Sequence, residues 1–309
     1  MTAETRAEAV PFDPRDKALN APVCIWDLKA ELGEGPVWSE AEKVLWFVDI
    51  LGHKIHRYNP VSAATRSWDT PVRPCFLVPL KGGDVLCGME DGLRRFAPAT
   101  GQFDDVLAVE RDLPGNRVND GHVDPSGRLW FGTMDDAEEN PTGSLYSIGA
   151  GHRLIRHHNG YTVSNGPAVS PDGRILYQCD SGLSTIYAFD LAPDGTLSER
   201  RIFAKVGDMA PDGLAMDRAG TLWAGVWGGG RIERFRPDGT RLDPIAIPAR
   251  NVTKVAFGGA EGRTVFVTTA RKGLSDAVLT AEPQTGGLFC LRTDVPGLVQ
   301  GAVTFPVAN

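Results

Sequence analysis

Oxygen-bearing side chains recur at one position relative to a repeated turn. Turn-like clusters begin at residues 39, 80, 124, 170, 217 and 258. The residues five positions before these turns are Glu34, Cys75, Asn119, Asn165, Asp212 and Thr253. Four of the six carry carboxylate or amide oxygens, the hard donors that divalent cations such as Ca²⁺, Mn²⁺, Mg²⁺ and Fe²⁺ prefer. If the shared position brings these side chains together, they can bind one divalent cation.

The charge of this set also suits a dication. Glu34 and Asp212 supply two negative charges, which would repel one another in a narrow channel that held no cation. The alternative is that these polar residues surround a narrow channel and hydrogen-bond to a column of water in it. Because the four oxygen donors include no His or Cys, a structural zinc site is not expected.

Short apolar runs bounded by Gly, Pro, Asp or Asn make up most of the chain, for example VLWFVDI, RLWFGTM and TLWAGVW. Runs of this length, rich in aromatic and β-branched residues, are typical of β-strands. The six turns are 41, 44, 46, 47 and 41 residues apart, the length of a four-stranded blade. The sequence therefore predicts an all-β, six-bladed β-propeller with four antiparallel strands per blade, whose innermost strands line a central channel.

The two ends of the chain are expected to complete the propeller together. After Gly287 only LFCLRT offers another clear strand, so residues 22–30, PVCIWDLKA, are predicted to form the outer strand of the last blade. Closure by this N-terminal strand leaves no sheet edge exposed. Residues 1–21 are expected to be a flexible N-terminal tail, and residues 22–309 a single propeller domain.

Composition narrows the possible partners and the compartment. The net charge of −7 argues against nucleic acid, and no stretch of about 18 apolar residues is present to cross a membrane. The first twenty residues lack the apolar region of a secretory signal. The five cysteines are an odd number without a C-x-x-C pair, which suits a reducing compartment. We therefore expect a cytoplasmic, monomeric protein that acts on a small molecule.

Four ordered motifs resemble those of the senescence marker protein, gluconolactonase and luciferin-regenerating enzyme family. They are LGEGPVW at 32–38, RVNDGHVDPSGRLWFGTM at 117–134, SNGPAVSPDGRILYQCDS at 164–181 and APDGLAMDRAGTLWAGVWGGG at 210–230. Within the family, the sequence is most similar to the bacterial pentonolactonases, xylonolactonase in particular. The resemblance extends from about Glu31 to the last blade.

The resemblance implies a propeller that hydrolyses sugar lactones with one divalent metal ion. It places the metal on Glu34, Asn165 and Asp212, and the substrate on Arg117 and Asn119. Because Ca²⁺ is scarce in a cytosol, we expect Fe²⁺ or Mn²⁺ in the cell, with Ca²⁺ or Zn²⁺ able to substitute. Whether Asn119 contacts the metal or the substrate stays open.

Lactone hydrolysis needs an activated water and stabilisation of the tetrahedral oxyanion, both of which a divalent metal can supply. Asp212 is the candidate for metal ligand and general base together, since a carboxylate with one oxygen on a metal can accept a proton on the other. Arg117 lies two residues before Asn119, so in an extended strand both side chains can reach sugar hydroxyls. The alternative for Arg117 is an ordinary surface arginine.

Two long loops are expected on the same face of the propeller as the metal, at residues 132–144 and 269–287. Long ordered loops on a functional face often act as walls or lids. In the first loop, Asp135 and Asp136 are predicted to bind substrate, while Ala137 stands where animal relatives have a substrate-contacting Glu. Trp227 either offers the sugar an apolar platform or packs between blades.

The predicted function is metal-dependent hydrolysis of a sugar lactone to the aldonic acid, with D-xylonolactone to D-xylonate as the preferred reaction. One alternative is an aryl esterase or phosphotriesterase on the same fold, which would favour an aromatic-lined pocket. Another is a propeller that binds a divalent cation without catalysis. A serine hydrolase of the G-x-S-x-G type is not expected, because the sequence contains no such motif.

Overall fold

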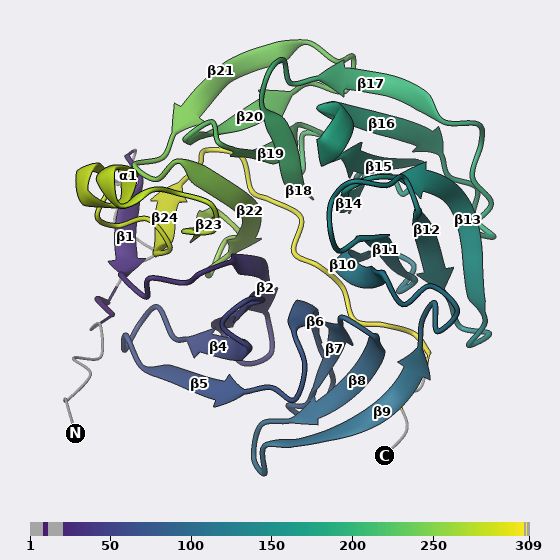
Figure 1. The fold of residues 1–309 in the computed structure, drawn as a ribbon, viewed down its shortest axis with the longest axis horizontal. Coiled ribbons are helices and arrows are strands. Elements are labelled where there is room, and N and C mark those ends of the chain that lie inside the picture. The colour runs from purple at the N-terminus through teal and green to yellow at the C-terminus, as the bar shows by residue number, and fades with distance from the viewer. Residues whose placement is uncertain (1–8, 12–20, 306, 308–309) are drawn as a thin grey trace.

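Six antiparallel four-stranded sheets stand in a ring around a central axis (Figure 1). The computed structural model describes residues 9–11, 21–305 and 307. Each sheet is one blade, and its first strand lies nearest the axis. The six-bladed, four-strand architecture predicted from the spacing of the turns is therefore confirmed.

The first three blades follow one another directly in the chain. Blade 1 contains β2 (Gly33–Ser39), β3 (Val44–Asp49), β4 (Lys54–Tyr58) and β5 (Thr65–Asp69). Blade 2 contains β6 (Pro74–Pro79), β7 (Val85–Met89), β8 (Gly92–Ala97) and β9 (Gln102–Ala108). Blade 3 contains β10 (Asn116–Val123), β11 (Leu129–Asp135), β12 (Gly143–Ile148) and β13 (Leu154–Tyr161).

The remaining blades repeat this order, and two short helices lie in their loops. Blade 4 contains β14 (Ser164–Val169), β15 (Ile175–Asp180), the 3₁₀ turn η1 (Ser181–Leu183), β16 (Thr185–Asp190) and β17 (Arg201–Lys205). Blade 5 contains β18 (Ala210–Met216), β19 (Leu222–Trp227), β20 (Arg231–Phe235) and β21 (Arg241–Ala246). Blade 6 contains β22 (Asn251–Gly258), β23 (Thr264–Ala270), α1 (Asp276–Ala281), β24 (Leu288–Arg292) and the N-terminal β1 (Val23–Trp26).

Strand β1 closes the ring by completing blade 6. It pairs antiparallel with β24, with Val23 opposite Cys290, as the sequence predicted. Ala9 in turn forms a bridge with Trp26, and the Tyr58 hydroxyl donates to the Val10 carbonyl at 2.6 Å. Most of the predicted tail, residues 1–8 and 12–20, lies outside the described residues, so its boundary at residue 21 stays a prediction.

Two blades share a turn that fixes the register of the inner strands. In blade 3 one oxygen of Asp124 accepts from the backbone N–H of Ser126 and of Arg128, and the other accepts from Trp130 Nε1 at 2.8 Å. In blade 5 Asp217 bonds in the same way to Trp223, at 3.1 Å. Because Asp and Trp lie six residues apart around one tight turn, the pair holds the hairpin and fills the space between sheets.

The face formed by these turns is covered by the C-terminal segment, which crosses the ring in yellow in Figure 1. Gly297 bridges Asp217 of blade 5, and the Thr304 N–H donates to the Gly127 carbonyl of blade 3. The channel is thus accessible from the opposite face, where the inner strands begin. No helix among the described residues is long and apolar enough to cross a membrane.

Candidate active site

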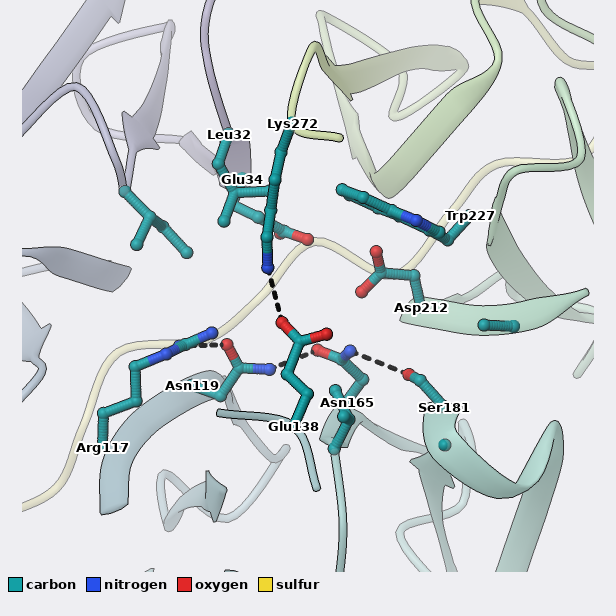
Figure 2. A pocket seen from close by; sticks show the side chains of 14 residues that line it. Leu32, Glu34, Arg117, Asn119, Glu138, Asn165, Ser181, Asp212, Trp227 and Lys272 are labelled. Carbon is teal, nitrogen blue, oxygen red and sulfur yellow. Dashed lines mark hydrogen bonds and ion pairs between the residues drawn. The ribbon is translucent and has the colours of Figure 1, made fainter. Parts of the chain in front are cut away.

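A cavity of about 190 Å³ lies at the open end of the channel (Figure 2). Its lining includes the six predicted residues Glu34, Arg117, Asn119, Asn165, Asp212 and Trp227. The first five come from the inner strands of blades 1, 3, 4 and 5, and Trp227 ends the second strand of blade 5. The structure therefore brings together residues separated by nearly two hundred positions of sequence. The shared blade position predicted this for Glu34, Asn119, Asn165 and Asp212.

A break in strand pairing accompanies this position in every blade. The inner strands show a register shift between Glu34 and Val37, Pro74 and Phe76, Val118 and Gly121, Asn165 and Ala168, Pro211 and Leu214, and Val252 and Val255. Such irregularities bend a strand and redirect its side chains, and they are frequent beside active sites. At Gly35 the backbone has a φ of +55°, and an added Cβ would lie 3.1 Å from the Cys75 carbonyl oxygen. Glycine after Glu34 thus permits the close approach of blades 1 and 2.

The two carboxyl groups of the ring influence one another electrostatically. Glu34 and Asp212 are both buried, and both line the cavity. Burial, together with the charge of Asp120, raises the pKa of Glu34 to about 7. Burial and the charge of Glu34 raise the pKa of Asp212 well above its ordinary value. In the absence of a cation, the pair therefore retains a proton that an isolated pair of acids would lose.

A chain of hydrogen bonds orients the two asparagines. Arg117 Nη1 donates to Asn119 Oδ1 at 2.6 Å, and Asn119 Nδ2 donates to Asn165 Oδ1 at 2.7 Å. Asn165 Nδ2 donates to Ser181 Oγ at 2.9 Å, and that hydroxyl donates to the Pro211 carbonyl at 2.6 Å. The last contact ties the network to the residue before Asp212. An amide oxygen has two lone pairs, so Asn165 Oδ1 can bind a cation while it accepts from Asn119.

Asp136 fixes Arg117 from behind the cavity. Its carboxylate accepts from Arg117 Nε at 3.0 Å and from both terminal nitrogens of Arg73 at 2.9 and 3.0 Å. Asp135 instead accepts from the backbone N–H of Glu139 and Asn140, within its own loop. Neither of the two aspartates lines the cavity. The structure places both of these predicted substrate-binding residues in support of the loop and of Arg117.

Two charged lining residues were missed by the sequence analysis. Glu138, in the loop after β11, and Lys272, in the loop after β23, form an ion pair across the mouth of the cavity (Figure 2). Both long loops were expected on this face, and this is confirmed. Neither side chain was singled out, because loop residues have no repeated position that would indicate their direction.

The other two residues of the ring position do not line the cavity. Cys75 is buried, with its thiol 3.8 Å from the Arg73 carbonyl oxygen. Thr253 Oγ1 donates to the Gly33 carbonyl at 2.6 Å, which ties blade 6 to blade 1. The remaining walls are apolar and come from Leu32, Ile50, Val163 and Ala210 beside Trp227.

The donors present fit one oxygen-ligated divalent cation. Glu34 and Asp212 supply carboxylate oxygens on one side of the space, and the asparagine amides supply neutral oxygens on the other (Figure 2). A bound dication stabilises the ionised form of neighbouring buried carboxyls, because it neutralises their charges. Among the described residues, no cluster of three or more His, Cys, Asp or Glu side chains is arranged to hold a metal ion. The expected ligand set, Glu34, Asn165 and Asp212, has only two such side chains, because its third ligand is an asparagine.

Comparisons with known proteins agree on the family. Residues 32–271 match the family model described as "SMP-30/Gluconolactonase/LRE-like region". The chain is 36% identical to the 6-deoxy-6-sulfogluconolactonase of Pseudomonas putida over 282 residues, which are 90% of this chain and 96% of that protein. It is also 36% identical to the L-arabinolactonase of Azospirillum brasilense, over 88% of this chain and 92% of that protein.

A solved structure agrees as well. The calcium-binding protein regucalcin of Agrobacterium tumefaciens superposes with a TM-score of 0.87 at 29% identity, over 96% of this chain and 99% of that one. The matched region contains all the lining residues discussed above except Lys272, which follows it directly. The chain belongs to the SMP-30/gluconolactonase/LRE-like family.

Proposed function

We propose that this protein, a sugar lactonase, hydrolyses a five-carbon aldonolactone, D-xylonolactone, to D-xylonate with one divalent cation held by Glu34, Asn165 and Asp212. The observation that carries the proposal is the convergence of two buried carboxyls with raised pKa values and an arginine-anchored amide chain in one cavity. At about 190 Å³, this cavity is smaller than the range of about 300–1,000 Å³ typical of drug-sized ligands. That size suits a small sugar lactone.

The names of the relatives support a sugar lactone as the substrate class. One is a lactonase for a sulfonated six-carbon lactone, and the other acts on the lactone of a five-carbon sugar. In this chain Glu138 and Lys272 close the mouth above the ring through an ion pair. The limited space beneath them favours the shorter, five-carbon substrate.

The residues of the cavity divide the work of lactone opening. Asp212 accepts a proton from the attacking water as the new C–O bond forms at the carbonyl carbon. As the ring C–O bond breaks, the same carboxyl returns that proton to the departing ring oxygen. When bound, a divalent cation polarises the carbonyl, lowers the pKa of water and favours the ionised form of both carboxyls.

Arg117 and Asn119 hold the sugar hydroxyls in this scheme. Arg117 is buried, and its partners Asp136 and Asn119 restrict the direction of its guanidinium group. A side chain that is already oriented loses little further freedom when it binds a hydroxyl. Trp227 and the neighbouring apolar walls face the carbon skeleton of the sugar.

We further propose Fe²⁺ or Mn²⁺ as the cation in a cytoplasmic, monomeric protein, with Ca²⁺ or Zn²⁺ able to replace it. Oxygen ligands can bind all four of these ions. Zn²⁺ is the softest of them and more often has nitrogen or sulfur ligands. All five cysteines are free thiols, which agrees with a reducing compartment.

The test is a pH-stat assay of metal-free and metal-reconstituted protein. The substrates are D-xylonolactone, L-arabinonolactone, D-gluconolactone and one aryl ester, phenyl acetate. We expect turnover only with metal, and the highest kcat/KM for D-xylonolactone. Faster hydrolysis of phenyl acetate would favour the aryl esterase alternative, although Trp227 is the single aromatic side chain among the described lining residues. Equal lactonase rates with and without metal would overturn the proposal.

A further inference from the structure

A second ion pair crosses the channel, and it is buried. Lys254 of β22 donates to both carboxylate oxygens of Asp120 of β10, at 2.5 and 2.7 Å. The exposed fractions of the two side chains are 7% and 4%. Blades 6 and 3 face one another across the ring, so the pair spans the channel axis. Neither residue lines the cavity.

The pair lies one residue deeper than the ring. Asp120 directly follows Asn119, and Lys254 directly follows Thr253, on strands that run away from the cavity mouth. The lysine stem passes over Gly213, where an added Cβ would lie 2.3 Å from Lys254 Cγ. Glycine after Asp212 is therefore needed for the lysine to reach the axis. The ion pair therefore occupies two of the inner strands that also carry the ring position, β10 and β22.

The ion pair also acts electrostatically on both acids of the ring. The charge of Asp120 raises the pKa of Glu34 and of Asp212, and the charge of Lys254 lowers both. Three carboxyls and one ammonium group thus share the buried channel. With every carboxyl ionised, their net charge is −2. Arg117 does not change this balance, because Asp136 pairs with it at 3.0 Å.

We propose that Lys254 and Asp120 set the net charge of the metal site and thereby its preference for a divalent over a trivalent cation. The inference rests on the proposed metal site at Glu34, Asn165 and Asp212. Charges act over several ångströms in a buried, low-dielectric channel, so a residue that touches no ion still changes the affinity for it. Lys254 acts on the metal site through its charge and does not contact substrate.

A purely structural ion pair would behave differently. Removing either partner of a buried pair leaves an uncompensated charge and destabilises the fold. If that were the whole role, Asp120→Asn and Lys254→Met would both weaken cation binding. If the pair sets the charge, the two substitutions change the cation affinity in opposite directions, because one makes the site less negative and the other makes it more negative.

The experiment is calorimetric titration of metal-free protein at pH 8 with Mn²⁺ and, separately, with Tb³⁺. We expect Asp120→Asn to bind Mn²⁺ at least about tenfold more weakly than wild type. We expect Lys254→Met to raise the affinity for Tb³⁺ relative to Mn²⁺ by about tenfold or more. The double variant, whose net charge again equals that of wild type, should return to within about threefold of the wild-type values.

Lys54→Met is the matched control. It removes a lysine of β4 that pairs with Asp69 of β5 on the outer strands of blade 1, and the two side chains are 45% and 86% exposed. Solvent screens such a pair, so cation affinity should change by less than about threefold. Circular dichroism of each variant checks folding. If Lys254→Met does not fold, the double variant still tests the inference, because it must bind Mn²⁺ about tenfold more tightly than Asp120→Asn alone.

The outcomes separate this inference from the proposed function. Wild-type protein that binds neither ion would overturn the metal site itself. Wild-type binding combined with equal weakening in Asp120→Asn and Lys254→Met would leave the metal site intact and overturn the role of the ion pair. A double variant as weak as Asp120→Asn would do the same.

Discussion

At the scale of single residues, the ring predicted from sequence lies where the repeat placed it. Glu34, Asn119, Asn165 and Asp212 share one cavity because each lies on the inner strand of its blade, five residues before the turn. The spacing of the turns did not predict the direction of the side chain that follows each of these residues. In a regular strand that neighbour would point away, but the register shift after the ring position turns Asp120 toward the axis as well.

Cation binding should depend on pH because of the protons held by the ring. The pKa of Glu34 is raised to about 7, mainly by burial, so a cation must displace a proton below that pH. We expect the affinity for Mn²⁺ to rise from pH 6 to pH 7 by about tenfold for each displaced proton. Calorimetry in two buffers of different ionisation enthalpy measures both the affinity and the proton release.

The stability of the metal-free protein should fall over the pH range in which the affinity for the cation rises. A raised carboxyl pKa means that the folded chain holds more protons than the unfolded chain between the ordinary value of 4.5 and about 7. The free energy of unfolding should therefore fall as pH rises through this window, and saturating metal should remove the loss.

For the pH dependence of cation binding, an affinity for Mn²⁺ that is constant between pH 6 and pH 8 would show that the cation displaces no proton.

At the scale of the elements, strand positions were predictable and loop directions were not. Strand and turn spacing reports a repeated physical unit, so the inner strands and the closing strand β1 could be inferred from the sequence. The loop after β11 has no such repeat. Asp135 and Asp136 were predicted to face the substrate, yet they hold the loop and Arg117, while Glu138 reaches the mouth of the cavity.

The closing strand offers a test of the architecture. Removing residues 1–30 deletes β1, including the buried Trp26, which packs edge-on against Phe47 and His56. Loss of one buried tryptophan alone costs about 3–5 kcal/mol. We expect the melting temperature to fall by more than about 10 °C, or folding to fail.

Removing residues 1–8 is the matched truncation. It keeps Ala9 and Val10, which bond to β1 and to Tyr58. The melting temperature of this variant, followed by circular dichroism, should match that of the full chain. If the 1–30 truncation melted at the wild-type temperature as well, β1 would not be required to close the ring.

At the scale of the whole molecule, the propeller gives a closed channel with one accessible end. The C-terminal segment covers the face of the hairpin turns, and the long loops of blades 3 and 6 narrow the other face. Two ion pairs cross the axis between blades 3 and 6. Lys254 and Asp120 are buried below the ring, and Lys272 and Glu138 lie above it. The molecule thus isolates two carboxyls from bulk water and leaves one small opening for substrate.

The central claim is that Asp212 both binds the cation and moves the proton. Its replacement by asparagine keeps an oxygen for the cation but removes the proton acceptor. In calorimetric titration, Asp212→Asn should bind Mn²⁺ more weakly than wild type. At a Mn²⁺ concentration that saturates each protein, its kcat for D-xylonolactone should be lower than that of wild type by about 10² or more, the range of a general base.

The control is Asp172→Asn, which changes an exposed turn carboxylate of blade 4 and should keep the wild-type kcat. The decisive quantity is therefore kcat of Asp212→Asn at saturating metal, measured in the pH-stat. A loss of about 10² or more with metal still bound supports the account. Hydrolysis within about threefold of wild type would contradict it and would leave Asp212 as a ligand alone.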